Sequence, residues 1–256
     1  MNGSEKHYLE RLLDPEDRDM IEKEEHFSQV MMMYSCAIRE VQTKLEVLND
    51  DLKSRYQRNP IHSIKSRIKK PVSLAKKLRK KGLPVSVDSI KGNINDVAGV
   101  RVICSFVDDI YTISEMLTSQ TDITLISQKD YIEHPKPNGY RSLHLIVEIP
   151  VFFADRMRPM RVEVQIRTIA MDYWASLDHQ LRYKKDDMDE NYRKEIEMRL
   201  KRCADMITAT DAEMLDIRKN IYGYRTFCPS AIGCCPSAAK DEFRRVGAAS
   251  ACPLSA

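Results

Sequence analysis

The sequence predicts an α+β protein of mixed α/β type, built on a mixed β-sheet of about five strands that is flanked by helices. Short runs rich in β-branched residues alternate along the chain with helical segments, and each run is brief enough to be a buried strand. Stripes of apolar residues at spacings of three and four predict one long helix near each end of residues 20–222. The chain has 256 residues, 43% of them hydrophobic and 31% charged, which suits a globular fold.

The first long helix is predicted over residues 20–56. Its stripe consists of Phe27, Met31, Tyr34, Ile38, Val41, Leu45, Leu48 and Leu52. Such a stripe faces either the core of its own subunit or a second subunit, and the sequence leaves both readings open. Asn59-Pro60 then ends the helix, because a residue before proline is driven out of the helical conformation.

A basic segment follows, with twelve Lys or Arg and no acidic residue between Leu52 and Val87. Such a surface favours phosphate groups. Pro71 fits a first helical turn and Gly82 a helix end. The helix between them places Val72, Ala75 and Leu78 toward the core. The opposite face then carries Lys69, Ser73, Lys77 and Lys80.

Four strands are predicted from their β-branched content, at residues 98–106, 123–127, 140–149 and 161–168. A short helix or turn is expected over residues 85–95, and amphipathic helices over 108–119 and 169–184. The last helix, residues 190–221, carries the second stripe. That stripe consists of Ile196, Leu200, Cys203, Ile207, Thr210, Met214, Ile217 and Ile221.

The ends of the chain differ in composition from residues 20–222, which we expect to be the functional domain. Residues 1–19 form a polar extension. Residues 223–256 are rich in small residues and show no helix or strand period, so a disordered tail is expected. No apolar run approaches the roughly 18 residues of a membrane span, and the N-terminus has no apolar leader region. We therefore expect a cytoplasmic protein without membrane contact.

Polar residues lie where a purely structural core would have none. Asp96 comes just before the first predicted strand, and Glu163 lies on the polar face of the fourth. Two carboxylates beside an array of lysines and arginines predict Mg²⁺-assisted phosphoryl transfer, because Mg²⁺ binds few protein carboxylates and completes its shell with water and phosphates. Tyr140, after a loop with Pro135 and Pro137, offers a ring on which a base can stack.

Each of these residues also has a plain structural reading, as a surface charge, a turn residue or a core ring. Composition and spacing alone support a phosphate-binding α/β protein, either a nucleotidyl or a phosphoryl transferase. An RNA-binding module that uses the basic segment, with Tyr140 stacking on a single-stranded base, is the alternative. The two differ in one respect, since only the enzyme needs Asp96 and Glu163.

Four segments closely resemble the synthetase domain of the RelA/SpoT family in order and spacing, and specifically its stand-alone small alarmone synthetases. They are RIKKPVSLAKKLRKKG, INDVAGVRVICSF, DYIEHPKPNGYRSLHLIVEIP and RVEVQIRTIAMDYWASLDHQLRYK. The resemblance covers about residues 20–221 and implies a fold similar to that of nucleotidyltransferases. It also implies transfer of the β,γ-pyrophosphate of ATP to the ribose 3′-hydroxyl of GDP or GTP. The product would be ppGpp or pppGpp, the alarmone of the stringent response.

The resemblance also implies roles for single residues. Asp96 matches the metal-binding aspartate, and Glu163 matches a glutamate that binds or faces Mg²⁺ and helps to deprotonate the 3′-hydroxyl. The residues matched to the ATP side are Arg67, Lys69, Ser73, Lys77, Lys80 and Arg101. The residues matched to the side of GDP or GTP are Lys136, Tyr140, His144, Gln165 and Arg167. Lys80 replaces the usual arginine and keeps its charge without the bidentate fork.

Positions at which the chain departs from the family pattern allow further predictions about activity and assembly. None of the six His is followed by Asp, the pair on which the family's hydrolase domain depends, so synthesis without hydrolysis is implied. One tetrameric subgroup binds alarmone through an aromatic residue and an asparagine, at the places where this chain has Ser63 and Asp172. The resemblance therefore favours the other, RelP-like subgroup. A homotetramer through the terminal helices is expected and no nucleic acid is required, although RNA stays open as a regulator.

Overall fold

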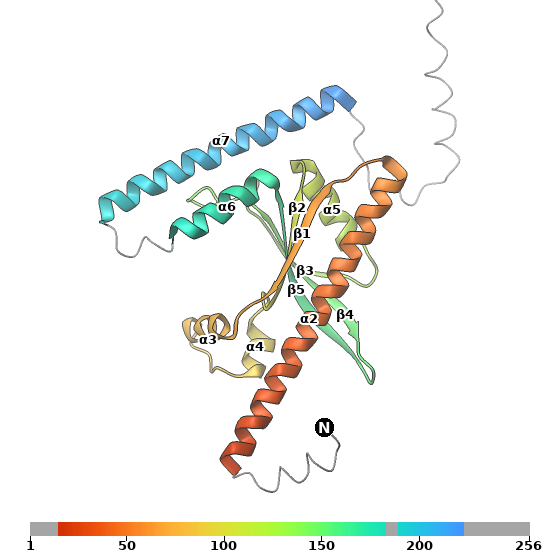
Figure 1. Cartoon of the computed structure of the whole chain (residues 1–256), viewed down its shortest axis with the longest axis vertical. Coiled ribbons are helices and arrows are strands. Elements are labelled where there is room, and N and C mark those ends of the chain that lie inside the picture. Colours follow the sequence, from red (N-terminus) through yellow and green to blue (C-terminus); the bar gives the residue numbers. More distant parts are fainter. Residues whose placement is uncertain (1–14, 183–188, 223–256) are drawn as a thin grey trace, which may run out of the picture. The chain divides into compact units, whose positions relative to one another are not determined.

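A five-stranded mixed sheet lies at the centre of the computed structural model, which describes residues 15–182 and 189–222 (Figure 1). The strand order is β1-β2-β5-β4-β3. Strands β2 and β5 are parallel, and the other neighbours are antiparallel. The strands are β1 (Ile61–Ile68), β2 (Ala98–Cys104), β3 (Thr124–Asp130), β4 (Leu143–Phe152) and β5 (Met157–Thr168). The predicted fold class is therefore confirmed.

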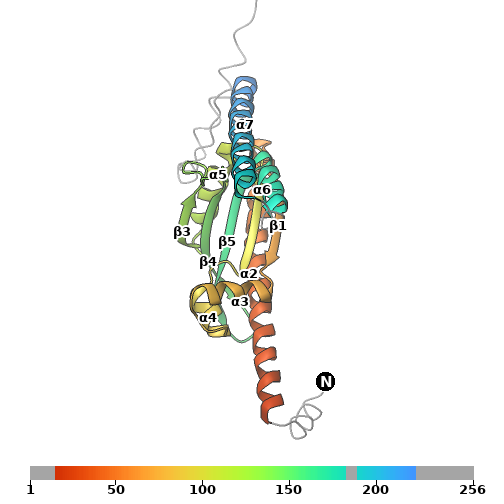
Figure 2. The same cartoon turned by 90° about the vertical axis from the view of Figure 1, so that its left-hand side faces the viewer.

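Helices cover one face of the sheet and both ends of its strands. α2 crosses the sheet and contacts β1, β2, β4 and β5, and α5 packs beside it on β2 and β5. Figure 2 shows α3 and α4 at one end of the strands and α6 and α7 at the other. The helices are α2 (Pro15–Tyr56), α3 (Pro71–Lys80), α4 (Val87–Asn93), α5 (Val107–Thr118), α6 (Ile169–Arg182) and α7 (Glu190–Tyr222).

The two faces of the sheet differ in polarity because side chains alternate along each strand. On β5, Val162, Val164 and Ile166 are fully buried on the side of α2 and α5. Their neighbours Glu163 and Gln165 point to the opposite side and are half-buried. Burying an aliphatic side chain of this kind contributes about 1.5–3 kcal/mol, so the apolar face holds the sheet to α2 and leaves the polar face available for ligands.

The apolar stripes of α2 and α7 differ in how far they are buried. The α2 stripe faces the core, since Tyr34, Val41 and Leu45 are at most 4% exposed. The stripe in α7 is largely open in its second half, where Met214 is 54% and Ile221 67% exposed. The first stripe therefore faces the core, which was one of its two possible positions, whereas much of the second stripe is exposed.

The sequence analysis did not predict strand β1. Only Ile61 of its eight residues is fully buried, because β1 is an edge strand whose other side chains are mostly polar. The phase of α3 was also predicted wrongly, since Val72 is 67% exposed and Leu74, together with Leu78, fills the core. The helix begins at Pro71, and counting from there puts positions 74 and 78 on the buried side.

The limits of the elements also differ in detail from those predicted. Helix α2 begins at Pro15, inside the extension predicted for residues 1–19, and α7 ends at Tyr222. The tail predicted for residues 223–256 lies outside the described residues. Among the helices of residues 15–182 and 189–222, none combines the length and apolar character needed to cross a membrane.

Candidate active site

A pocket of about 150 Å³ opens on the polar face of the sheet, over β1, β2 and β5. Its lining residues are Lys65, Ser66, Arg67, Asp96, Gly99, Val100, Arg101, Glu163 and Gln165. Both predicted carboxylates and three of the predicted polar or cationic residues, Arg67, Arg101 and Gln165, therefore lie in one cavity, although they come from three separate segments of the chain.

Strand register explains why these side chains meet. In the parallel β2–β5 pair, Gly99 lies opposite Glu163 and Arg101 opposite Gln165. The antiparallel β1 adds Arg67 opposite Gly99. Cross-strand neighbours point to the same side of a sheet, and Gly99 has no side chain to fill the space between Arg67 and Glu163. The glycine thus keeps the floor of the pocket open.

Asp96, just before β2, is held by two lysines that flank the start and the body of α3. Its Oδ2 forms an ion pair with Lys69 and lies 2.7 Å from Nζ of Lys77. Burial acts to raise the pKa of Asp96, but the hydrogen bonds and charges of the two lysines outweigh burial and hold the pKa below its usual range. Asp96 is therefore a carboxylate at neutral pH.

Glu163 is also kept ionised. Its Oε1 lies 3.3 Å from Nδ1 of His144, and its Oε2 accepts a hydrogen bond of 2.8 Å from Nε2 of Gln165. Burial acts to raise the pKa of Glu163, while His144 and Gln165 lower it and Asp96 raises it slightly, so the pKa ends below its ordinary value. Both neighbours therefore fix the carboxylate in position and in charge.

A chain of hydrogen bonds leads from Glu163 to the loop before β4. The Tyr140 hydroxyl lies 2.8 Å from Nε2 of His144, and Arg167 donates to the same hydroxyl from Nη2. With a neutral imidazole that donates from Nδ1 to Glu163, Tyr140 must donate to Nε2. The order of donors is then Arg167, Tyr140, His144 and Glu163, and it couples the tyrosine ring to the carboxylate.

The Tyr140 ring stands among cations and other rings. Nζ of Lys136 lies 4.7 Å from its centroid and 4.6 Å from that of Tyr131. Tyr131 and His144 pack edge-on against it, with centroids 6.0 and 5.8 Å away. Tyr140 thus lies next to His144 and Arg167, and Lys136 lies over its ring. The sequence had not indicated that Tyr131 belongs to this group.

Asp172, at the start of α6, pairs with three cations, two of which line the pocket. Its Oδ1 accepts hydrogen bonds from Arg101 at 3.1 Å and from Arg167 at 3.3 Å, and Lys65 lies 3.6 Å from Oδ2. The sequence had marked Asp172 only as a departure from a family pattern. Its structural role joins the arginine predicted for one nucleotide to the arginine predicted for the other.

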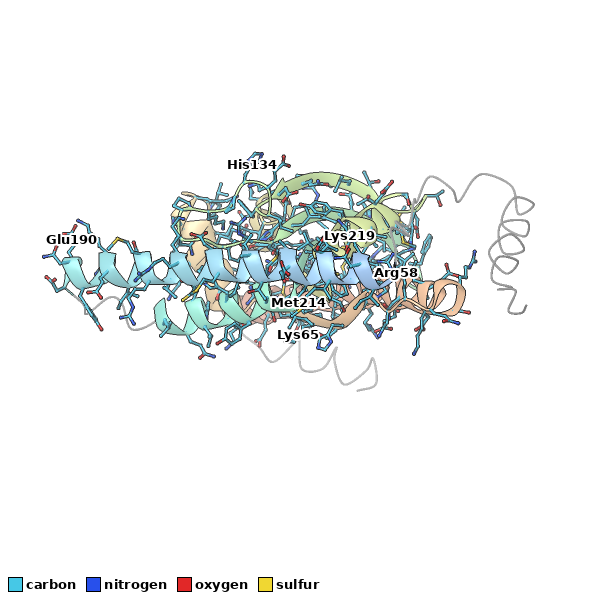
Figure 3. All side chains as sticks on the ribbon, turned by 90° about the horizontal axis from the view of Figure 1, so that it is seen from above. Arg58, Lys65, His134, Glu190, Met214 and Lys219 are labelled. Atoms are coloured by element: carbon cyan, nitrogen blue, oxygen red, sulfur yellow. The ribbon has the colours of Figure 1, made fainter. Side chains whose placement is uncertain are left out.

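Helix α7 supports the loop that carries Tyr140. Gly139 has a φ of +89°, and a Cβ placed there would lie 2.5 Å from the Cβ of Ala204 on α7. Only glycine fits both the left-handed backbone and the close approach. Asn138 also donates to Asp178 of α6 at 3.4 Å. In Figure 3, α7 runs between His134 of this loop and Lys65 of β1.

Two of the residues predicted for the ATP side neither line the pocket nor pair with its carboxylates. Ser73 and Lys80 are exposed on α3, and their side chains do not reach the carboxylates as Lys69 and Lys77 do. Within residues 15–182 and 189–222, no group of three or more His, Cys, Asp or Glu is arranged around a metal position. The pair of carboxylates remains, and Oδ1 of Asp96 is buried without a hydrogen-bond partner in this part of the chain.

Comparison with known proteins extends these observations. Residues 66–188 match the region found in RelA / SpoT proteins. The chain is 40% identical over 197 residues to the GTP pyrophosphokinase YwaC of Bacillus subtilis, covering 77% of this chain and 92% of that protein. It is 33% identical over 199 residues to the GTP pyrophosphokinase YjbM of the same organism, covering 77% and 91%.

Solved structures of similar proteins have the same fold. The small alarmone synthetase 2 from Bacillus subtilis superposes with a TM-score of 0.67 at 39% identity, over 76% of this chain and 98% of that one. The small alarmone synthetase 1 from Bacillus subtilis, bound to its product pppGpp, gives a TM-score of 0.69 at 33% identity over 77% and 98%. The similarity thus spans nearly the whole length of these proteins.

Proposed function

The chain belongs to the RelA/SpoT family, and on this basis we propose that it is a (p)ppGpp synthetase, a GTP pyrophosphokinase without hydrolase activity. It transfers the β,γ-pyrophosphate of ATP to the 3′-hydroxyl of GDP or GTP. The observation that carries this proposal is the single pocket in which Asp96 and Glu163 lie among Lys65, Arg67 and Arg101. Carboxylates that stay ionised beside several cations suit the transfer of a highly charged group.

The two substrates occupy opposite sides of this pocket in our proposal. ATP lies along the basic side, where Arg67 and Arg101 line the pocket and Lys69 and Lys77 surround Asp96. Ser73 and Lys80, exposed on the same helix as Lys77, extend this surface toward the phosphates. The acceptor lies on the side of Lys136, Tyr140, His144, Gln165 and Arg167, with its guanine against the Tyr140 ring.

The residues fit a Mg²⁺ ion held by Asp96 and Glu163. The buried Oδ1 of Asp96 has no partner in the described chain and offers a ligand oxygen, and both carboxylates have lowered pKa values. Two carboxylates are as many as Mg²⁺ usually takes from a protein. When bound, the ion supplies neutralisation of the phosphate charge. Lys69 and Lys77, which pair with Asp96, would lie beside the ion and would add positive charge for the phosphates.

The proposed reaction needs one base and a fixed geometry. The acceptor 3′-oxygen attacks the β-phosphorus of ATP, the bond from that phosphorus to the oxygen of the α-phosphate breaks, and AMP leaves. Glu163 accepts the proton of the 3′-hydroxyl. His144 and Gln165 hold the two oxygens of Glu163 and keep it ready to do so. Cations on both sides of the pocket stabilise the charge on the transferred pyrophosphate.

The reaction is tested with purified protein, ATP labelled in the γ-phosphate, Mg²⁺, and either GDP or GTP. We expect the label in ppGpp or pppGpp and an equal amount of AMP. Label released as inorganic phosphate, or no product with either acceptor, would contradict the proposal. Tight binding of single-stranded RNA that persists in Glu163→Gln, without any synthesis by the unaltered chain, would favour the RNA-binding alternative.

We place the enzyme in the cytoplasm, where its substrates are, and we propose that it assembles as a homotetramer through its terminal helices. The exposed Met206, Met214, Ile217 and Ile221 of α7 support this assembly, because an apolar row on a long helix is stabilised by a partner helix. Light scattering at micromolar concentration is expected to give four times the mass of 29.6 kDa. A monomer at that concentration would rule the assembly out.

A further inference from the structure

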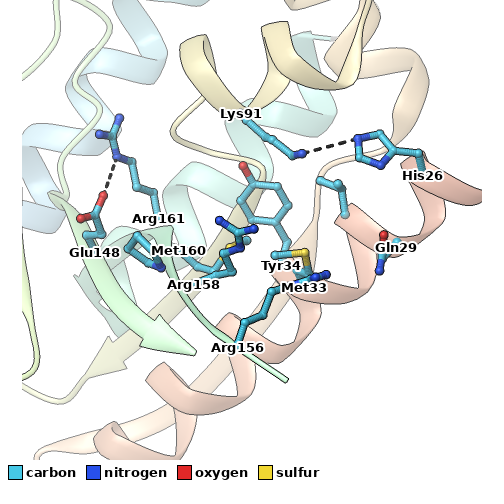
Figure 4. Close-up of a pocket in the computed structure, with 12 residues that line it drawn as sticks. His26, Gln29, Met33, Tyr34, Lys91, Glu148, Arg156, Arg158, Met160 and Arg161 are labelled. Atoms are coloured by element: carbon cyan, nitrogen blue, oxygen red, sulfur yellow. Dashed lines mark hydrogen bonds and ion pairs between the residues drawn. The ribbon is translucent and has the colours of Figure 1, made fainter. Parts of the chain in front are cut away.

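A second and larger pocket, of about 390 Å³, lies between the N-terminal half of α2, helix α4 and the β4–β5 hairpin (Figure 4). We call it the hairpin pocket. Its lining residues are His26, Gln29, Val30, Met33, Tyr34, Lys91, Glu148, Arg156, Arg158, Pro159, Met160 and Arg161. None of these residues lines the pocket that holds Glu163 and Asp96. The proposed synthetase reaction makes no use of it.

The hairpin pocket is strongly positive. Among its described lining residues, Lys91, Arg156, Arg158 and Arg161 are permanent cations, and Glu148 is the one carboxylate. Glu148 is already engaged, because it accepts a hydrogen bond of 3.1 Å from Nε of Arg161. Three positive charges therefore remain without a carboxylate in the lining, and four cations around one cavity repel each other unless an anion joins them.

The contacts that these cations make leave them free to bind an anion. The side chain of Arg158 forms no hydrogen bond or ion pair with any residue of the described chain, and Arg158 is exposed. Nζ of Lys91 faces His26 Nε2 at 3.5 Å. Among the described residues, the side chain of Arg156 pairs only with the exposed Asp155 beside it. Arginines and lysines in this state can turn into the cavity and donate several hydrogen bonds to a phosphate.

The floor of the pocket adds an apolar surface and one unused donor. Val30, Tyr34 and Met160 are 2%, 4% and 8% exposed, and Met33 completes the wall. No hydrogen bond joins the Tyr34 hydroxyl to another residue of the described chain, although the side chain is almost fully buried. Burial raises the pKa of Tyr34 more than Arg161 lowers it, so the hydroxyl keeps its proton and can donate it.

We propose that the hairpin pocket is a second ligand site, which binds the oligophosphate group of a nucleotide to its cations and packs the organic part against Tyr34, Met33 and Met160. The cations and the free hydroxyl select a multiply charged anion with oxygen acceptors. The buried aromatic and thioether surface favours an organic body on that anion, and the volume falls in the usual range for small-molecule sites.

Arg161 connects the hairpin pocket to the segment just before Asp96. Arg161 donates from Nη1 to Oδ1 of Asn95 at 3.1 Å, and Asn95 immediately precedes Asp96. An occupant that pairs with Arg161 therefore lies one side chain away from the segment that positions Asp96. The binding inference itself does not depend on the proposed reaction, and its test does not measure that reaction.

The test uses the full chain with ¹³C-methyl methionine, because Met33 and Met160 line the hairpin pocket and do not line the catalytic one. Each methyl signal is assigned by its Met→Leu variant. ADP, inorganic tripolyphosphate and adenosine are titrated separately. We expect ADP to shift both signals with saturation. The double variant Arg156→Ala with Arg158→Ala should raise the half-saturating concentration at least tenfold, whereas Arg39→Ala, at an exposed arginine of α2, leaves it unchanged.

The three titrations separate the sources of the phosphate. Tighter binding of ADP than of tripolyphosphate assigns the pocket to nucleotides. Equal affinity for ADP and tripolyphosphate supports an oligophosphate site and shows that the adenosine part of ADP adds nothing to binding. The proposal is overturned if neither compound moves the two signals, if the double variant responds like the unaltered chain, or if adenosine shifts them as strongly as ADP does.

Discussion

Nζ of Lys77 on α3 lies 2.7 Å from Oδ2 of Asp96, and Lys69 pairs with the same oxygen from the segment before the helix. The basic segment and the first carboxylate are thus bound to each other. Two lysines on one carboxylate leave a net positive charge, which is what the triphosphate of ATP requires. The ion pairs therefore fix α3 and the segment before it against Asp96.

Lys77→Ala should raise KM for ATP roughly 10- to 100-fold, because a hydrogen bond between charged groups contributes about 1.5–3 kcal/mol. KM for GDP or GTP should change little, since Lys77 is not on the acceptor side. Lys76→Ala, at the exposed neighbouring lysine of α3, is the matched control. Steady-state kinetics with each substrate varied in turn measure both constants. Equal increases for ATP and for the acceptor would show that Lys77 acts on the fold instead of on ATP.

Glu163→Gln should lower kcat by about 10²- to 10⁴-fold, the usual contribution of a positioned general base. The side chain keeps its shape, so the midpoint of thermal unfolding should stay within a few degrees. Glu115→Gln makes the same change at an exposed site on α5 and should leave kcat unaltered. Production of (p)ppGpp from labelled ATP is the measurement. Full activity in Glu163→Gln would remove Glu163 from the mechanism.

The pH dependence of kcat should move when His144 is replaced. Burial raises the pKa of Glu163, and His144 is the largest influence that lowers it. In His144→Leu this pKa therefore rises. Because the base must be ionised, activity is lost as pH falls through the pKa, and a higher pKa shifts the acid limb of the profile to higher pH. The exposed His62 supplies the control His62→Leu. An acid limb that stays in place or moves to lower pH would contradict the coupling.

The roles of the Tyr140 ring and of its hydroxyl can be tested separately. Tyr140→Ala should raise KM for the guanine nucleotide roughly 5- to 100-fold, since stacking on a base contributes about 1–3 kcal/mol. Tyr140→Phe keeps the ring but loses the hydrogen bonds to His144 and Arg167. It should leave KM nearly unchanged and lower kcat, because His144 then orients Glu163 less firmly. If the phenylalanine variant had the same high KM as the alanine variant, the stacking role would be excluded.

Much of the catalytic pocket follows from the chain itself, because strand alternation puts Glu163 and Gln165 on one polar face and the β-branched runs place the neighbouring strands. The sequence does not reveal how the strands are aligned with one another in the sheet. The pairing of Gly99 with Glu163 arises from contacts between segments more than sixty residues apart. Edge strand β1 was missed for a related reason, since its residues bury little and show no clear apolar period.

The role of Asp172 was equally hidden, because its three cationic partners come from β1, β2 and β5 and no local pattern connects them. The hairpin pocket gave no sequence signal either. His26, Lys91 and Arg158 are single polar residues in three different segments, and each one alone is typical of a solvated surface. Local pattern predicts elements and their polar faces, whereas clusters assembled across the fold require the structure.

Gly139→Ala should weaken both the fold and the binding of the acceptor. The φ of +89° is unfavourable for alanine, and its Cβ would lie 2.5 Å from that of Ala204. A cost of about 1–3 kcal/mol lowers the thermal midpoint by roughly 2–10 °C for a domain of this size. KM for GDP or GTP should rise because the loop that carries Tyr140 moves away from α7. Gly92→Ala, where a Cβ meets no atom within 4 Å, is the matched control and should be neutral or slightly stabilising.

The contact with α7 is separated from the backbone strain by adding Ala204→Gly to Gly139→Ala. That second change removes the methyl group against which the new Cβ collides, and the positive φ remains. The double variant should therefore recover part of the acceptor affinity, while Ala204→Gly alone should lower stability by about 1 kcal/mol as a glycine inside a helix. Differential scanning calorimetry and acceptor kinetics on the four proteins measure the coupling. Strictly additive effects would mean that α7 does not position the loop, and that Gly139 is required by its backbone conformation alone.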